Sequence, residues 1–442
     1  MSTIFKSKTS EYIYATKVVH HLSHTQRETE TERERERERR SPTIFTLPKL
    51  FTAYLSCRQT KRKTINALKF EIACEQKLLN LAKELKSQTY RPGRSICFIV
   101  TYPKLREIFA ADFRDRIVHH LLINKIISLF EQRFIYDSFA CREEKGTHVA
   151  VFRLRKFIYQ VTKNKTQNAF YGQFDIKSFF SNIDKDVLFT IIEREINKSF
   201  PVTIQKEILW LTRTIIFHNP TQNYYRKGKK ELFNQIPADK TLFKTPNGRG
   251  LPIGNLTSQF FANVYLNELD QFVKRKLKVK YYLRYVDDLV LLSESSEQLR
   301  RWRKEIDRFL KETLKLELHP NKDKYGSVYQ GIDFVGYVVK PNYVLSRKRV
   351  VSNLKTKLHY FNQGLFLVSD NQRQKALPLS RQPTKEEIKQ MTAMVNSYYG
   401  HFRWANSYRL RHNLYEKHFG ELKKYLKPEK DLSFFSPGKP TG

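Results

Sequence analysis

The chain has 442 residues, enough to bury a large core and to form two or three subdomains. It carries 81 Lys and Arg against 44 Asp and Glu, a net charge of +37 that favours nucleic acid as a partner, with an anionic membrane surface as the rival. Long apolar runs and a signal-peptide pattern are absent, so spanning and secretion are not expected, and the four cysteines lack zinc-site spacing, which fits reduced thiols in a cytoplasm.

The first 60 residues differ in composition from the rest of the chain. Between Arg27 and Arg40 there are six Arg, six Glu and two Thr, which leaves nothing apolar to bury. A helix here would have no apolar stripe. We therefore predict that residues 1–60 form a disordered, low-complexity tail and that globular sequence begins near Thr64.

Helices around a strand hairpin are predicted next. An apolar stripe from Leu68 to Leu85 indicates a helix, residues 98–102 indicate a strand, and apolar residues from Ile117 to Leu129 indicate a second helix. His119 and His120 lie in that helix, and adjacent helical side chains point in directions too different to chelate one metal well. We expect these histidines to serve structure or RNA contact.

Two strand-like segments carry carboxylates where apolar residues dominate. One runs from Phe170 to Asp175, and the other, residues 280–293, places Asp287 and Asp288 at or beside a hairpin turn. Between them lie a polar, basic stretch and then residues 248–263, whose Gly and Pro followed by an apolar run predict a loop leading into a helix.

The three aspartates suggest a site for hard cations. Taken alone, an Asp-Asp pair is equally explained as a surface turn between two core strands. If the strand that ends at Asp175 were a neighbour of the hairpin, however, three carboxylates would supply oxygen ligands for two cations that bridge a phosphate.

These residues resemble the palm of a reverse transcriptase, with Asp175 in its first catalytic motif and Tyr285-Val286-Asp287-Asp288 as its signature turn. The resemblance implies an α+β right-hand polymerase fold with fingers, palm and thumb and an antiparallel palm sheet flanked by helices. The amino-acid sequence from Ile253 to Gln259 is similar to that of diversity-generating retroelement enzymes, which copy a template RNA and misincorporate opposite its adenines. A retron-type or group II intron-like enzyme is the alternative, and an inactive polymerase-fold RNA-binding protein is a more distant one.

The resemblance also implies roles for single residues. Arg106 would grip the incoming triphosphate, the carbonyl of Ile176 would bind metal, and Phe180 would lie under the nucleotide sugar and exclude a 2′-hydroxyl, unless it is an ordinary core aromatic. Lys322, with Lys324 kept open, would protonate the leaving pyrophosphate. The nucleotide site would further include Ile253, Gly254 and Gln259, and the primer grip Phe334, Gly336 and Tyr337.

A helical thumb is expected to close the chain. Pro383 to Glu387 predicts a helix start with a capping box, and the apolar stripe ends at Gly400. The cofactor implied is a pair of Mg²⁺ ions with Mn²⁺ as a substitute. The implied partners are template RNA, the RNA–DNA hybrid, deoxynucleoside triphosphates and a small basic accessory variability protein, in a bacterial cytoplasm for a bacterial or phage gene. The predicted divisions are a tail at 1–60, fingers at 61–168, a palm at 169–340 with a fingers-associated insertion at about 218–247, a thumb at 341–427 and a disordered tail at 428–442.

Overall fold

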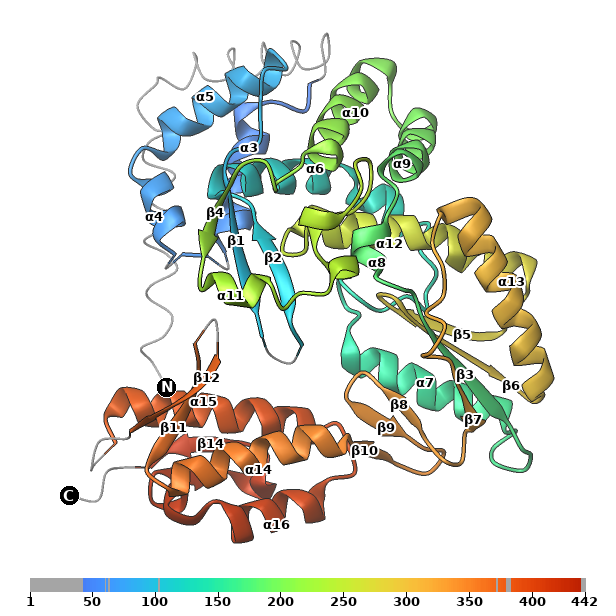
Figure 1. The fold of residues 1–442 in the computed structure, drawn as a ribbon, viewed down its shortest axis with the longest axis vertical. Helices are drawn as coiled ribbons and strands as arrows, with labels where there is room; N and C mark the ends of the chain where they lie inside the picture. Colours follow the sequence, from blue (N-terminus) through green and yellow to red (C-terminus); the bar gives the residue numbers. More distant parts are fainter. Residues whose placement is uncertain are drawn as a thin grey trace, which may run out of the picture.

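The computed structural model describes residues 43–59, 61–62, 64–101, 104–370, 373–378 and 383–438. Its architecture mixes helices with mainly antiparallel sheets, which confirms the expected fold class (Figure 1). We use the names fingers, palm and thumb for three groups of elements, which are defined below. Within the described part of the chain, no helix combines the length and the apolar character that a bilayer crossing requires.

The fingers combine a helical layer with a small sheet. Strands β1 (Ser95–Val100) and β2 (Arg106–Ala110) form an antiparallel hairpin, and β4 (Tyr224–Lys227) adds to β1 in parallel. Thus part of the basic stretch at 218–247 belongs to the same sheet as the hairpin. The helices are α3 (Leu47–Arg58), α4 (Ile65–Glu71), α5 (Cys74–Lys86) and α6 (Phe113–Glu131).

Two sequence predictions fail in the fingers. Helix α3 buries Leu50 and Ala53 completely, so residues 43–59 belong to the globular core and not to a disordered tail. The charge repeat that motivated the tail ends at Arg40, and residues 1–42 lie outside the described residues. The apolar stripe at 68–85 forms two helices, α4 and α5, and Ile72 at the break between them is 86% exposed, so it does not belong to a continuous buried stripe.

A four-stranded antiparallel sheet forms the centre of the palm, in the order β5-β6-β3-β7. Its strands are β3 (Phe170–Asp175), β5 (Tyr281–Tyr285), β6 (Asp288–Ser293) and β7 (Lys324–Ser327). Side chains alternate between its faces. Leu289 and Leu291 join one core, and Val290 and Leu292 join another.

Both faces of the palm sheet are therefore covered. The first core includes α9 (Lys185–Ser199), α10 (Val202–Phe217), α12 (Leu256–Gln271) and the charged helix α13 (Ser296–Leu314). The second includes α7 (Thr147–Val161) and a small antiparallel sheet in which β9 (Tyr337–Val339) lies between β8 (Ile332–Phe334) and β10 (Val344–Ser346). Short elements between these are α8 (Phe179–Asn182) and α11 (Lys230–Phe233).

The thumb packs helices around its own core. Helix α15 (Lys385–Phe402) begins with the predicted capping box between Thr384 and Glu387, but it continues two residues past the predicted end at Gly400. The predicted C-terminal tail is also wrong for residues 428–438, because Leu432 and Phe435 are buried in this core. The other elements are α14 (Lys348–Asn362), β11 (Leu365–Asp370), β12 (Arg373–Pro378), α16 (Tyr408–His418), β13 (Leu426–Pro428) and β14 (Phe435–Pro437).

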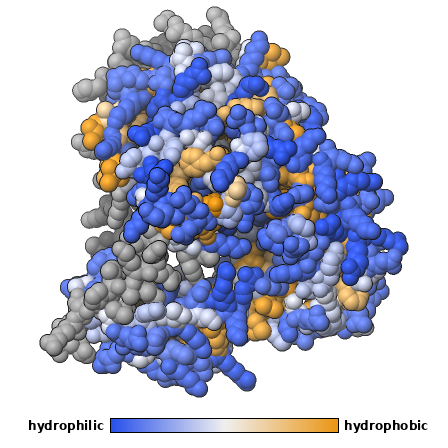
Figure 2. Space-filling view, viewed as in Figure 1, coloured by the Kyte–Doolittle hydropathy of each residue, from blue (hydrophilic) through white to orange (hydrophobic). Residues whose placement is uncertain are grey.

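Aromatic stacking joins the thumb to the palm. The His401 ring stacks on Tyr337 with centroids 4.1 Å apart, and the Trp404 ring stacks on His148 at 4.3 Å. Figure 2 shows a face dominated by hydrophilic residues and hollowed between the thumb and the rest of the molecule.

Candidate active site

Register between strands brings the three predicted carboxylates together. Asp175 is the last residue of β3 and lies directly opposite Asp288, the first residue of β6. Tyr285 is the partner of Asp288 on the other side, so Val286 and Asp287 form the two-residue turn of the β5–β6 hairpin. The predicted adjacency of the strand and the hairpin is confirmed.

The pKa values of Asp287 and Asp288 are both raised above their ordinary value. Burial, followed by the charges of Asp288 and Asp175, raises the pKa of Asp287 to about 7. Burial and the Asp175 charge raise the pKa of Asp288 to about 6, while Lys104, Lys322 and Lys324 oppose this shift. Carboxylates that repel one another in this way are stabilised as anions by a nearby cation.

The cation beside Asp175 in this structure is the ammonium of Lys322, which contacts the Oδ2 atom. The lysine comes from the loop before β7, and the backbone N–H of His319 in the same loop donates to the Asp175 carbonyl at 2.7 Å. Among the described residues, no three His, Cys, Asp or Glu side chains already converge as a metal site. The donor set nevertheless fits hard cations, because it consists of carboxylate oxygens whose charge is only partly balanced.

Two basic residues of the fingers act on the same cluster through their charges. Arg106 begins β2, is exposed, and its charge lowers the pKa of Asp287, while Lys104 acts in the same direction on Asp288. Strand β2 is held against residues 248–255, which precede α12 and are called the predicted nucleotide loop, because the N–H of Phe109 donates to the carbonyl of Ile253 at 2.9 Å. Arg106 and Ile253 are thus placed by one contact between β2 and this loop.

Gly254 permits that contact. Its φ is +124°, and a Cβ there would lie 2.7 Å from Ile108 Cγ2 and 3.1 Å from the Phe109 carbonyl oxygen. Nearby, the side chain of Asn255 accepts from the N–H of Ala111 at 3.1 Å. Gln259 lies further along, exposed on α12. The loop and β2 therefore fit together only with glycine at position 254.

The predicted sugar-contacting ring lies on the same side of the palm. Phe179 is buried in the core, whereas Phe180 is only partly buried. The carbonyl of Phe180 accepts from the N–H of Leu251 at 2.8 Å, which ties α8 to the nucleotide loop. Ile176 has a buried side chain, as expected for a residue that would act through its carbonyl.

The predicted primer-grip residues form a tight turn between β8 and β9. Phe334 and Tyr337 are fully buried, and the Tyr337 hydroxyl donates to the His401 carbonyl at 2.9 Å. Gly336 has φ +96°, and a Cβ there would lie 3.1 Å from His401 Cε1. The two aromatic side chains of this turn therefore serve the core and the joint with the thumb, whereas Val335 and Gly336 between them are only partly buried.

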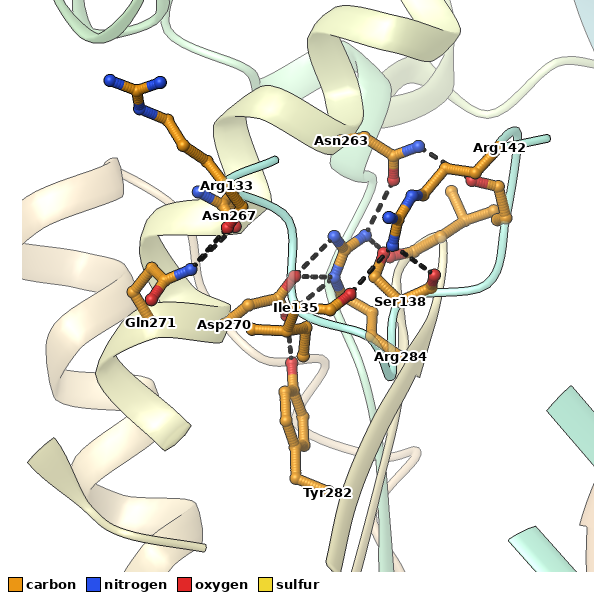
Figure 3. Close-up of polar contacts among 12 residues, drawn as sticks. Arg133, Ile135, Ser138, Arg142, Asn263, Asn267, Asp270, Gln271, Tyr282 and Arg284 are labelled. Carbon is orange, nitrogen blue, oxygen red and sulfur yellow. Dashed lines mark hydrogen bonds and ion pairs between the residues drawn. The ribbon is translucent and has the colours of Figure 1, made fainter. Parts of the chain in front are cut away.

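Sequence reasoning missed a buried polar network beneath the Asp287 turn (Figure 3). Arg284 has no exposed surface and donates three bonds of 2.7–3.0 Å to the carboxylate of Asp270 on α12. Its Nη1 atom donates to Asn263 Oδ1 at 3.1 Å and to the Val286 carbonyl at 2.9 Å. Tyr282 donates to Asp270 at 2.7 Å. A single arginine thus links the hairpin turn to the helix behind it.

This bond network supports a strained turn. Val286 has φ +56°, a conformation that β-branched residues rarely adopt. Arg284 and Asp270 could have been noticed as charged residues within apolar runs, but nothing in their spacing indicates that they pair.

Comparison with known proteins agrees with this geometry. The family description "Reverse transcriptase (RNA-dependent DNA polymerase)" matches residues 102–339, more than half of the chain. The chain belongs to the reverse transcriptase family. All three aspartates and the nucleotide loop of this reverse transcriptase lie within the matched residues.

Relatives of this reverse transcriptase include proteins of group II introns. It is 25% identical over 323 residues to protein YkfC of Escherichia coli, covering 65% of this chain and 77% of that protein. It is 22% identical over 331 residues to the group II intron-encoded protein LtrA of Lactococcus lactis, covering 60% and 50%. The putative COX1/OXI3 intron 2 protein of Saccharomyces cerevisiae is 20% identical, covering 60% and 34%. The reverse transcriptase thus spans half or less of the length of these intron relatives.

Solved structures with a similar course of the chain include telomerases. Telomerase of Candida albicans in complex with a fragment of telomeric RNA matches 75% of this chain and 60% of its own, with 13% identity and a TM-score of 0.41. Apo telomerase of Candida tropicalis matches 70% and 52%, with 10% identity and a TM-score of 0.43.

Proposed function

We propose that this protein is an RNA-directed DNA polymerase that copies a template RNA into cDNA. The observation that carries the proposal is the register that places Asp175 opposite Asp288, beside Asp287, within the region of family similarity. The substrates would be deoxynucleoside triphosphates and a primer paired to RNA, and the basic composition supports binding to such a hybrid.

Asp175, Asp287 and Asp288 would hold two divalent cations, Mg²⁺ or its substitute Mn²⁺, with the Ile176 carbonyl as a further ligand. Such ions lower the pKa of a primer 3′-hydroxyl and neutralise charge on a leaving pyrophosphate. Asp175 would exchange its contact with the Lys322 ammonium for this role. Lys322, released beside the site, would then donate a proton to the leaving group.

Other residues of the site would orient the nucleotide. Arg106, whose charge acts on Asp287, would bind the triphosphate, for which a planar guanidinium with paired donors is suited. Phe180 would pack under the sugar and select a deoxynucleotide. Gln259 and Ile253 would lie near the nascent base pair, and the turn around Gly336 would approach the primer end.

The experiment is primer extension on an RNA template with Asp287→Asn. We expect synthesis to be lost while affinity for the RNA–DNA hybrid is kept, because the amide cannot replace a charged ligand. Glu294→Gln is the matched control, since it removes one exposed carboxylate just beyond the far end of β6. Retained synthesis by Asp287→Asn contradicts the assignment.

Two subtypes remain distinguishable by experiment. The residues from Ile253 to Gln259 support a diversity-generating enzyme that errs opposite template adenines and works with a small basic accessory protein. The intron-encoded relatives support a group II intron-like enzyme instead.

The base bias decides between the two subtypes. Retroviral and intron-encoded reverse transcriptases generally carry Gln where this chain has Ile253. Ile253 cannot form the hydrogen bond that a Gln could, which is worth about 0.5–1.5 kcal/mol, so nucleotide selection would be loosened by up to roughly tenfold. A diversity-generating enzyme would misincorporate chiefly opposite adenine, and Ile253→Gln would lower that rate. Equal error at all four template bases favours the intron-like subtype.

A further inference from the structure

A polar cavity lies behind the nucleotide loop. It has a volume of about 450 Å³ and is bordered by the last residues of α10, the first of α9 and the loop at 245–250. Its ionisable lining residues are Lys185, His218 and Arg249. One carboxylate lies nearby, that of the exposed Asp186, whose Oδ2 atom is 3.9 Å from where a Cβ on the lining residue Gly248 would be. Burial and the Lys185 charge lower the pKa of His218, so the positive charge of the lining comes from Lys185 and Arg249, and these two favour an anion.

Lys185 is the central residue of the cavity. It is the first residue of α9 and is only 7% exposed. Its ammonium lies 3.5 Å from the His218 carbonyl oxygen, and no carboxylate in the described part of the chain forms an ion pair with it. Burial lowers the pKa of Lys185 to about 8. Burying an ammonium without a counter-charge costs free energy that an anion would recover.

Two more groups point to the same ligand. The Nε2 atom of His218 is buried without a hydrogen-bond partner among the described residues. The Arg249 side chain is exposed at the mouth of the cavity, while its backbone bridges to Asp184. The Asp184 carboxylate does not compete for the cavity, because it caps α9 by accepting from the N–H groups of Asp186 and Val187.

The cavity wall is continuous with the proposed nucleotide site. The Gly250 N–H donates to the Ile183 carbonyl and the Leu251 N–H to that of Phe180, both at 2.8 Å. The loop that carries Arg249 therefore leads within four residues to Ile253. An anion bound in the cavity would therefore contact this loop and stabilise its position.

We propose that this cavity binds a phosphate group through Lys185, Arg249 and His218. Two sources share this chemistry, a phosphodiester of a bound RNA strand and a free phosphate. The first source rests on the proposed function, but binding itself does not.

The test uses the full chain and Lys185→Met, with Lys206→Met as the matched control on the exposed face of α10. In one arm, inorganic phosphate is added at constant ionic strength set with chloride, and the melting temperature is measured. In the other, affinity for single-stranded RNA is measured over a range of salt. Arg249→Ala, at an exposed position, repeats both arms with a variant whose folding is not at risk.

The arms separate the two sources. If free phosphate binds, it raises the melting temperature of wild type and Lys206→Met but not of Lys185→Met or Arg249→Ala. If an RNA phosphate binds, the negative slope of log K against log salt becomes less steep by about 0.7 in Lys185→Met and stays unchanged in Lys206→Met. The same phosphate effect and the same slope in wild type and Lys185→Met would overturn the proposal. Neither readout needs polymerisation, so failure of DNA synthesis would leave this result intact.

Discussion

Replacing Arg284 with methionine tests the buried network beneath the Asp287 turn. The guanidinium and its partner Asp270 have no exposed surface, and three hydrogen bonds join them. Arg284→Met leaves that carboxylate buried without a counter-charge, which costs about 3–5 kcal/mol. The Val286 carbonyl also loses its bond, so the turn that positions Asp287 is freed.

The assay is urea unfolding followed by tryptophan fluorescence, together with single-turnover primer extension. Tyr282→Phe is the graded control, because it removes one bond to Asp270 and leaves the Val286 bond in place, for a loss of about 1.5–3 kcal/mol. Arg284→Met combined with Asp270→Leu removes both charges and should recover much of the loss. If Arg284→Met costs under 1 kcal/mol, or the double variant loses the sum of both single losses, the network does not brace the turn.

Three further predictions concern single residues of the site. The pKa of Asp287 in the native state is about 7, above its ordinary value of 3.8. Between about pH 4 and 7 the native state therefore keeps a proton on Asp287 that the unfolded state has released. The free energy of unfolding of wild type consequently falls as pH rises through that window. Asp287→Asn should therefore be more stable than wild type by about 1–3 kcal/mol at pH 8 and equal to it near pH 4, as measured by urea unfolding without divalent cations; equal stability at both pH values contradicts this. Gly254→Ala should lower the free energy of unfolding by about 1–3 kcal/mol because its methyl group meets β2, whereas Gly400→Ala, with open space around it inside a helix, should not lower it. Lys322→Met should slow single-turnover addition about 100-fold while Lys324→Met stays near wild type, since only the former lysine contacts Asp175; equal rates would remove it from the reaction.

Local patterns predicted much of the palm and part of the thumb. Alternating apolar residues and a two-residue turn are local properties, so the hairpin around Asp287 and the strand ending at Asp175 were visible in the sequence. The capping box at Thr384 was visible for the same reason. The helix at 47–58 was missed because its burial depends on packing against α6, which no local pattern reports.

The available side chains can be read from the amino-acid order alone: three carboxylates among apolar strands, a strongly basic chain, and glycines where the loops turn. Folding was needed to show that Asp175 faces Asp288, that Lys322 rather than Lys324 contacts Asp175, and that Phe334 and Tyr337 are buried in the core. Pairing between strands more than a hundred residues apart is selected by the burial of both sheet faces together, a property of the whole palm that no single segment contains.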